Sequence, residues 1–176
     1  MRAVIQRVLE AQVMINDDCI SRIDKGMLVF LGIASDDVQE DADIMVNKII
    51  NLRIFQDQLG KMNLSLMDTG GEVLVVSQFT LLANLEKGRR PSFDDAAQQD
   101  RAETFYKKVT SGLQAKNIRV KEGRFKELSL NEQRKLFVEM LDMNQMYVNF
   151  SERADKKYNL SREDIALSEK FYNTKK

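Results

Sequence analysis

The sequence predicts an α+β domain, because it contains strand-like and helix-like hydrophobic patterns in separate segments. Residues 2–34 follow strand patterns, whereas residues 37–52 and 94–115 repeat their apolar side chains at helical spacing. Strand patterns precede the helical ones and return after them, an order typical of α+β folds. With 176 residues, 43% of them hydrophobic, the chain has one domain's length and enough apolar side chains for a core.

The N-terminal part is expected to form an antiparallel meander that leads to a buried strand. In "RAVIQRVLEAQVMI" apolar residues interleave with polar ones, "NDD" makes a turn, "CISRI" is a short return strand, and "KGMLVFLGIA" is a continuous apolar run. The single cysteine, Cys19, cannot form an internal disulfide, which suits a reducing compartment. Its thiol is either inert and partly buried or reactive.

Two amphipathic helices are predicted farther along the chain. The first covers about residues 37–52, with Ser35 or the aspartates after it as the N-cap, and the second covers about residues 94–115. Between them, "RIFQDQLGKMNLSLMDTGGEV" is expected to form a hairpin-like excursion, in which Asp68 is a turn residue and the two glycines supply positive φ. The segments "EVLVVSQF" and "IRVKEGRF" are predicted strands.

The C-terminal part differs in character from the rest of the chain. No glycine or proline follows Gly123, so strong turn signals are absent there. Capping boxes placed before apolar residues predict helices over about residues 130–143 and 161–172, joined by a linker. We therefore expect a core domain over residues 1–125 and a helical extension over residues 126–176.

The composition removes several functional classes. The 27 basic and 27 acidic residues cancel, so a nucleic-acid contact must come from a local cluster or from shape. Without histidine, no serine or cysteine can be activated by an imidazole, and an ordinary zinc site cannot be built. The carboxylates of "SDDVQEDAD" are explained by the dipole of the helix that follows them. We therefore expect no metal and no cofactor.

The expected location of the protein follows from its hydrophobic pattern. No apolar run approaches the roughly 20 residues that a membrane helix needs. The N-terminal segment is interrupted by Arg2, Gln6, Arg7 and Glu10, which is unlike a signal peptide. We expect a cytoplasmic protein that has no membrane partner.

The stretch Ser77-Gln78-Phe79-Thr80 is the strongest candidate for chemistry, because it ends a strand that should be buried. Backbone N–H groups at a strand end are free of the sheet, so those of Phe79 and Thr80 could bind a carbonyl oxygen as an oxyanion site. Ser77 and Thr80 could then position an ester or a water. In the plainer interpretation, both hydroxyls only satisfy turn backbone groups.

The loop "EKGRRPSF" is the second candidate. It concentrates the positive charges of Lys87, Arg89 and Arg90, Pro91 stiffens it, and Phe93 offers a surface on which a base could stack. This combination suits contacts with RNA phosphates and a nucleobase. A charge run of this kind is also compatible with an ordinary solvated loop.

Arg7 is the third candidate, because it stands among apolar strand residues. A buried or half-buried arginine needs a carbonyl or carboxylate partner, so Arg7 could clamp another segment in place. It could equally lie on the solvent face of an edge strand.

Together these stretches resemble the D-aminoacyl-tRNA deacylases, also called D-tyrosyl-tRNA deacylases. The resemblance runs from Met1 to about Phe125, and "SQFTL" and "KGRRPSF" are highly specific in combination. It also includes "MRAVIQRV", "KGMLVFLGI", "KIINLRIF", "GKMNLSLMDTGGEVLVV" and "GRF", in the family's order and spacing. The resemblance implies a homodimer of α+β subunits, whose sheets form a barrel-like core with two packed helices.

The resemblance also implies an activity, the hydrolysis of the ester between a D-amino acid and the terminal ribose of tRNA. The reaction centre would lie at the dimer interface and would use main-chain groups around Ser77, Gln78, Phe79 and Thr80. Thr80 matches a threonine that has been favoured as a nucleophile, but we prefer a route in which the ribose hydroxyl of the substrate takes part. Positioning and backbone electrostatics then carry the catalysis.

The chain departs from the family near its C-terminus. There the family carries a Gly-Pro dipeptide with a cis peptide bond, which enters the partner's pocket and rejects L-amino acids. This chain has neither residue after Gly123, so Arg7, which in the family helps to hold that element, lacks its expected partner. Altered chirality or activity is one expectation. The alternatives are a non-catalytic tRNA- or nucleic-acid-binding paralogue and an interaction protein whose helical tail docks a partner.

Overall fold

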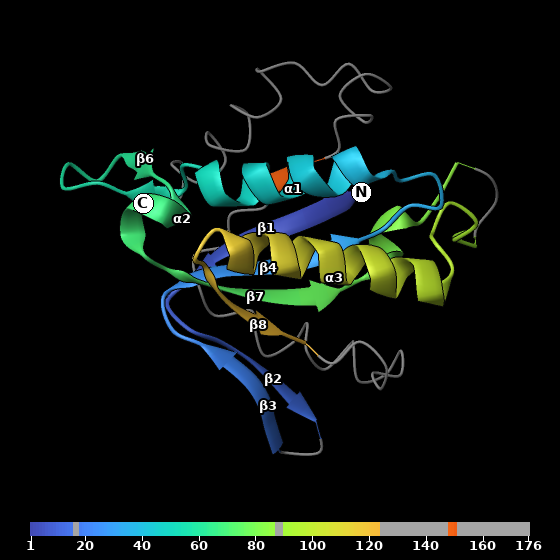
Figure 1. Ribbon diagram of the computed structural model, residues 1–176, viewed down its shortest axis with the longest axis horizontal. Helices are drawn as coiled ribbons and strands as arrows, with labels where there is room; N and C mark the ends of the chain where they lie inside the picture. The colour runs from blue at the N-terminus through green and yellow to red at the C-terminus, as the bar shows by residue number, and fades with distance from the viewer. Residues whose placement is uncertain (16–17, 87–89, 124–147, 151–176) are drawn as a thin grey trace.

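Two long helices lie side by side on one face of a β-sheet (Figure 1). They are α1 (Gln39–Asn51) and α3 (Gln99–Ala115), and they confirm the predicted α+β class. The computed structural model describes residues 1–15, 18–86, 90–123 and 148–150. In that part of the chain, no helix is long and apolar enough to cross a membrane.

The main sheet has five strands in the order β8-β7-β4-β1-β9. β7 is parallel to both of its neighbours, whereas β1 is antiparallel to both of its own. Two separate hairpins pair β2 with β3 and β5 with β6. The strands are β1 (Arg2–Val8), β2 (Ala11–Ile15), β3 (Asp18–Ile23), β4 (Gly26–Gly32), β5 (Phe55–Gln56), β6 (Met62–Leu64), β7 (Glu72–Ser77), β8 (Arg119–Glu122) and β9 (Val148–Phe150).

The predicted N-terminal meander is wrong in its connections. β1 pairs with β4, and β2 and β3 form a hairpin of their own rather than the next two strands of the main sheet. Every residue of β4 is buried, as expected for a central strand that has a neighbour on each side and both faces covered. Periodicity identified the strands, but it does not specify which strands are neighbours. Cys19 lies exposed on β3, so the expectation of a partly buried thiol is also wrong.

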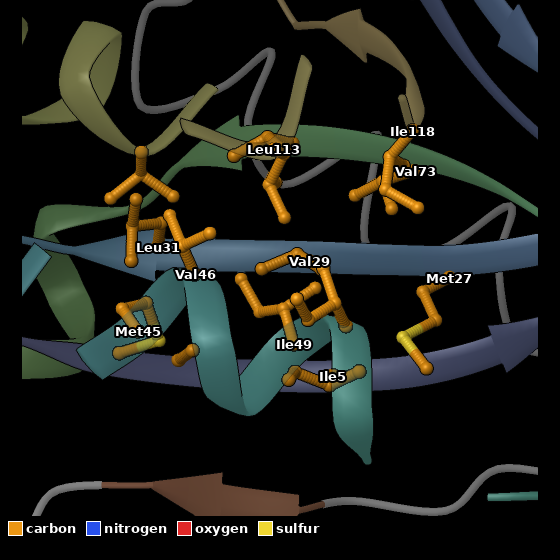
Figure 2. Close-up of a cluster of buried hydrophobic side chains, with 14 of the residues drawn as sticks. Ile5, Met27, Val29, Leu31, Met45, Val46, Ile49, Val73, Leu113 and Ile118 are labelled. Atoms are coloured by element: carbon orange, nitrogen blue, oxygen red, sulfur yellow. The ribbon is translucent and has the colours of Figure 1, made fainter. Parts of the chain in front are cut away.

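The principal core fills the space between the sheet and the two long helices (Figure 2). The helices approach closely at Gly112, where an added Cβ would lie 2.8 Å from a methyl group of Val46. Tyr106 of α3 is fully buried, and its hydroxyl donates a hydrogen bond to the carbonyl of Val75 at 2.8 Å. Burial raises the pKa of this phenol, so it stays neutral as a donor. The side chains labelled in Figure 2 are Ile5, Met27, Val29, Leu31, Met45, Val46, Ile49, Val73, Leu113 and Ile118.

A smaller core covers the opposite face of the sheet. The β2–β3 hairpin folds back onto this face and contributes apolar side chains to it. Because both faces of the sheet are covered, the strands that lead to the candidate site are held from two sides. This cluster contains Val8, Ala11, Val13, Ile23, Leu28, Phe30, Leu74 and Val76.

Both long helices begin later than the sequence indicated. Val38, rather than Ser35 or an aspartate, is the N-cap of α1, and the side chain of Asp41 accepts from its N–H at 2.8 Å. Asp37 is buried instead, where its carboxylate accepts from the N–H of Ala34 at 2.7 Å and pairs with the amino group of Met1. The expected first turn of α3, from residue 94, is irregular because its backbone binds residues 33–35, as in Ala97 N–H to Ile33 carbonyl at 2.9 Å.

The hairpin-like excursion is confirmed, but its end differs from the prediction. Residues expected to form a simple turn instead complete a one-turn helix, α2 (Leu66–Thr69). The Asp68 carboxylate accepts from the N–H of Ser65 at 2.8 Å and from its hydroxyl at 2.6 Å. These hydrogen bonds lower the pKa of Asp68. Gly70 ends the helix with φ of 62°, whereas Gly71 needs no positive φ.

The strand predicted from "IRVKEGRF" is present as β8. β9 falls within the segment that was predicted to link two helices, and it pairs with β1 through Ala3 and Phe150, so the linker interpretation is wrong at this point. The helices predicted over residues 130–143 and 161–172 lie outside the described residues. The division into 1–125 and 126–176 stays a prediction.

Candidate active site

The candidate site lies at the carboxyl ends of the parallel strands β4 and β7. Ser77 is opposite Leu31 in the ladder, and the N–H of Gln78 donates to the Leu31 carbonyl at 2.8 Å. The chain then turns into a short 3₁₀ helix, η1 (Phe79–Leu82). The carboxyl ends of parallel strands commonly hold ligands in α/β sheets, because loops diverge there. The "SQFT" segment therefore lies at the end of the sheet, where its backbone groups no longer pair with a neighbouring strand.

Within the described residues, two backbone N–H groups of this segment have no acceptor. The N–H groups of Leu81 and Ala83 return to the carbonyls of Gln78 and Thr80, at 3.3 and 3.1 Å. In the part of the chain that the structure describes, the N–H groups of Phe79 and Thr80 make no hydrogen bond. They are the first two donors of a helical turn, which have no partner within the turn. This arrangement provides the adjacent free donors that an oxyanion site requires.

The side chains of the segment do not behave as the plainer interpretation expected. The side-chain amide of Gln78 donates to the hydroxyl of Thr80, and both side chains are half-buried. Neither Ser77 nor Thr80 binds a turn backbone group through its hydroxyl within the described residues. Because the Thr80 oxygen accepts from Gln78, its own hydrogen stays available for donation.

The structure brings the two best sequence candidates together. The rings of Phe79 and Phe93 meet edge to face, with centroids 5.2 Å apart and planes at 69°. The basic loop is closed at its base by two hydrogen bonds between Asn84 and Ser92, at 2.8 and 3.0 Å. Arg90 is exposed on this loop, whereas Lys87 and Arg89 lie outside the described residues. Phe79 is 38% exposed, so part of its ring is open to solvent beside the free amides.

Arg7 is not part of this cluster within one chain. Its guanidinium donates to the carbonyl of Ile54 at 2.7 Å, which confirms that it clamps another segment and contradicts the solvent-face alternative. Arg7 is opposite Met27, whereas Ser77 is opposite Leu31. Four residues of strand separate these two levels, about 13 Å along β4.

Sequence reasoning missed two residues that shape the site. The Arg2 guanidinium donates to the carbonyl of Leu81 at 2.8 Å, and Gly32 lies beneath η1. A glycine at the end of an apolar strand signals a close backbone approach, so Gly32 could have been found. No pattern pointed to Arg2, because its partner lies far along the chain. In the described residues, no group of histidine, cysteine or acidic side chains is arranged to hold a metal ion.

Comparison with known proteins decides the family. The family model for D-Tyr-tRNA(Tyr) deacylase matches residues 4–131 of this chain. The chain belongs to that family. The assignment confirms the resemblance seen in the sequence, and the deacylase match spans both the "SQFT" segment and the basic loop.

Curated relatives agree with the deacylase assignment. A D-aminoacyl-tRNA deacylase of Dictyoglomus turgidum is 51% identical over 125 residues, which are 71% of this chain and 80% of the relative. A D-aminoacyl-tRNA deacylase of Clostridioides difficile is 50% identical over 125 residues, 71% of this chain and 84% of the relative. The non-catalytic alternatives are not favoured, since both relatives carry the name of the enzyme.

Solved structures share the deacylase fold. One, named c-Myc DNA Unwinding Element Binding Protein, has a TM-score of 0.68 and 42% identity, over 73% of this chain and 87% of its own. A second, described as a probable eukaryotic D-amino acid tRNA deacylase, has a TM-score of 0.62 over 86% of this chain and 94% of its own. Its identity of 16% means that it supports the fold alone.

Proposed function

We propose that this deacylase hydrolyses the ester bond of D-aminoacyl-tRNA and releases free D-amino acid and tRNA. The observation that carries the proposal is the pair of free N–H groups on Phe79 and Thr80, in a chain that belongs to this family. Water adds to the ester carbonyl carbon, the bond from that carbon to the ribose oxygen breaks, and the ribose oxygen takes a proton. This reaction removes D-amino acids from tRNA before translation can use them.

The two amides stabilise the negative charge that develops on the carbonyl oxygen during this reaction. Donors that are fixed before the reaction stabilise such charge without reorganising, and removing one typically slows an enzyme by about 100- to 1,000-fold. With no histidine in the chain, the proton transfer relies on the ribose hydroxyl of the substrate. We assign Thr80 the role of a hydrogen-bond donor rather than of the nucleophile, because the chain has no histidine to remove the proton of its hydroxyl.

The tRNA end binds across the aromatic pair and the basic loop. Phe79 and Phe93 offer an edge-to-face pair on which the terminal base stacks. Arg90, together with Lys87 and Arg89, binds phosphate oxygens. These contacts place the ester over the free amides, and positioning of this kind supplies a large part of the rate enhancement.

The enzyme acts in the cytoplasm as a homodimer, with its reaction centre at the subunit interface. The separation between Arg7 and the "SQFT" segment along the sheet supports this assembly. Arg7 lies too far from the pocket of its own subunit to contribute to it, so any role in catalysis would be in the pocket of the partner subunit. The family's Gly-Pro gate is missing after Gly123. Discrimination against L-amino acids is therefore relaxed in this chain.

Hydrolysis of matched D- and L-substrates tests the proposal. Purified full-length protein is incubated with D-Tyr-tRNA and with L-Tyr-tRNA, and the aminoacylated tRNA that remains is measured over time. We expect rapid loss of the D-ester and measurable loss of the L-ester. If neither ester is hydrolysed faster than in buffer, the proposed activity is wrong. Full D-activity with complete rejection of the L-ester would contradict relaxed discrimination only, and another segment would then replace the gate.

A further inference from the structure

The turn η1 is held in place by residues that lie outside the site itself. It contains four residues, and the hydrogen bond from the Leu81 N–H to the Gln78 carbonyl, at 3.3 Å, is longer than usual. A short 3₁₀ turn with such a bond does not define its own orientation well. Its direction in the protein therefore depends on what surrounds it.

Arg2 binds the C-terminal end of this turn. Its guanidinium donates to the Leu81 carbonyl at 2.8 Å, from a half-buried position on β1. Carbonyls at the end of a helical turn lack partners within it, and they carry partial negative charge that a guanidinium complements. One end of η1 is thus tied to β1, while Gln78 at the other end is tied to Leu31 of β4.

Gly32 completes this support. It is opposite Arg2 in the β1–β4 ladder, so η1 crosses the end of β4 to reach Arg2. A Cβ at Gly32 would lie 3.0 Å from the Gln78 carbonyl oxygen and 3.1 Å from the Leu81 Cβ. Because Gly32 has no Cβ, η1 can lie close against the end of β4, and the Arg2 hydrogen bond ties the turn to β1.

We propose that Arg2 is a positioning residue of the active site, which fixes η1 and thereby aims the Phe79 and Thr80 amides at the ester oxygen. This proposal rests on the proposed function of the same site. Arg2 acts through the backbone of Leu81 and does not contact the substrate. Catalytic donors must be held within about 0.5 Å and 10–20° of their productive geometry, so a loose η1 loses rate before it loses binding.

Two substitutions at Arg2 test the proposal. Arg2→Gln shortens the side chain and removes the charge, and Arg2→Lys keeps one charged donor that can reach a carbonyl. We expect kcat for D-Tyr-tRNA to fall by about 10- to 100-fold in Arg2→Gln, since a misplacement near 1 Å costs about 100-fold, and KM to change by less than kcat does. Arg2→Lys should recover part of that loss.

Arg101→Gln is the matched control. Arg101 also donates from its guanidinium to a backbone carbonyl, that of Asp37, but it joins α3 to the start of α1. Its loss should lower the melting temperature about as much as Arg2→Gln does and leave kcat unchanged. An unchanged kcat in Arg2→Gln, or an equal loss of kcat in Arg101→Gln, would overturn the proposal.

A second measurement separates this proposal from the proposed function. The ¹H–¹⁵N signals of Phe79 and Thr80 report the orientation of the two amides without any substrate. We expect both signals to shift, and their hydrogen exchange to accelerate, in Arg2→Gln but not in Arg101→Gln. Unchanged signals in Arg2→Gln refute the positioning role. If the wild-type protein hydrolyses no ester while these signals still shift, the proposed function fails and the structural role of Arg2 stands.

Discussion

At the scale of single residues, Thr80 contributes two different groups to the site. Its backbone N–H is one of the two free donors, and its side-chain oxygen accepts from Gln78. A side-chain substitution removes the hydroxyl but leaves the backbone donor in place. The two contributions can therefore be separated by experiment, and they are expected to differ in size because the free amides face the developing charge.

Thr80→Ala is expected to lower kcat for D-Tyr-tRNA by less than about 100-fold, below the loss typical of removing an oxyanion donor. The hydroxyl donates to the substrate in our proposal and forms no covalent bond to it. Single-turnover kinetics of Thr80→Ala and Thr80→Ser measure the effect. Activity that is abolished by alanine and retained by serine would instead identify Thr80 as a nucleophile.

Asp68 makes stability depend on pH through its bonds to Ser65. Its pKa in the folded protein is lowered, so its stabilising contribution is complete above the unfolded value, about 3.9, and is lost as pH falls through the folded value. We expect Asp68→Asn to destabilise the protein at pH 7 and to differ little from wild type near pH 2. Urea unfolding at both pH values measures this difference. The exposed Asp43→Asn serves as a control with a small effect at either pH.

At the scale of elements, close backbone approaches decide where the helices and η1 lie. Gly32 lets η1 cross the end of β4, and Gly112 lets α3 approach Val46 of α1. Both glycines serve packing, and neither has a positive φ. Of the two, only the approach at Gly32 involves η1, which carries the amides of Phe79 and Thr80. Substitutions at these two positions therefore separate effects on catalysis from effects on stability.

Gly32→Ala is expected to lower kcat by about 10-fold or more, because its Cβ meets Gln78 and Leu81 at 3.0 and 3.1 Å and displaces η1. Gly112→Ala brings a Cβ within 2.8 Å of Val46 and should lower stability by about 1–3 kcal/mol with kcat unchanged. Steady-state kinetics and thermal unfolding of both variants provide the comparison. A similar kcat loss in both would indicate that η1 is not specifically affected.

At the scale of the whole molecule, charge is balanced, so binding of a polyanion depends on where the cations lie. The 27 basic and 27 acidic residues cancel and create no general attraction for RNA. The basic loop lies next to Phe79, at the end of the molecule where α1 and α3 begin (Figure 1). Lysines at the opposite end, where both helices finish, do not share that position.

Replacement of Lys87, Arg89 and Arg90 by glutamine should weaken tRNA binding and flatten its salt dependence. Each lost phosphate contact reduces the slope of log K against log salt by about 0.7–0.9, so three contacts change it by about 2–3. Binding measured between about 50 and 200 mM salt provides the test. Replacement of Lys48, Lys61 and Lys116, at the far end, is the control, and equal effects of both triple variants would contradict a loop-specific contact.

Much of the fold was predictable from local pattern. The apolar runs that became β4 and β7 and the helical spacing of α1 and α3 identified these elements, because burial imposes a period on each. Their ends were less predictable: α3 begins at Gln99 because tertiary hydrogen bonds hold the preceding residues. The order of the strands was not predictable from local pattern, because β1 pairs with β4 rather than with the next strand in the sequence.

The sequence by itself determined the chemistry that is available: no histidine, one strand that ends in "SQFT", one basic loop, and the family to which these motifs belong. The tertiary structure alone decided that Phe93 meets Phe79, that Arg2 binds Leu81, and that the amides of Phe79 and Thr80 make no hydrogen bond within the described residues. The physical reason is the range of the interactions. Side-chain type and periodicity are local properties, whereas a contact between residues far apart in sequence depends on how the whole sheet pairs and packs.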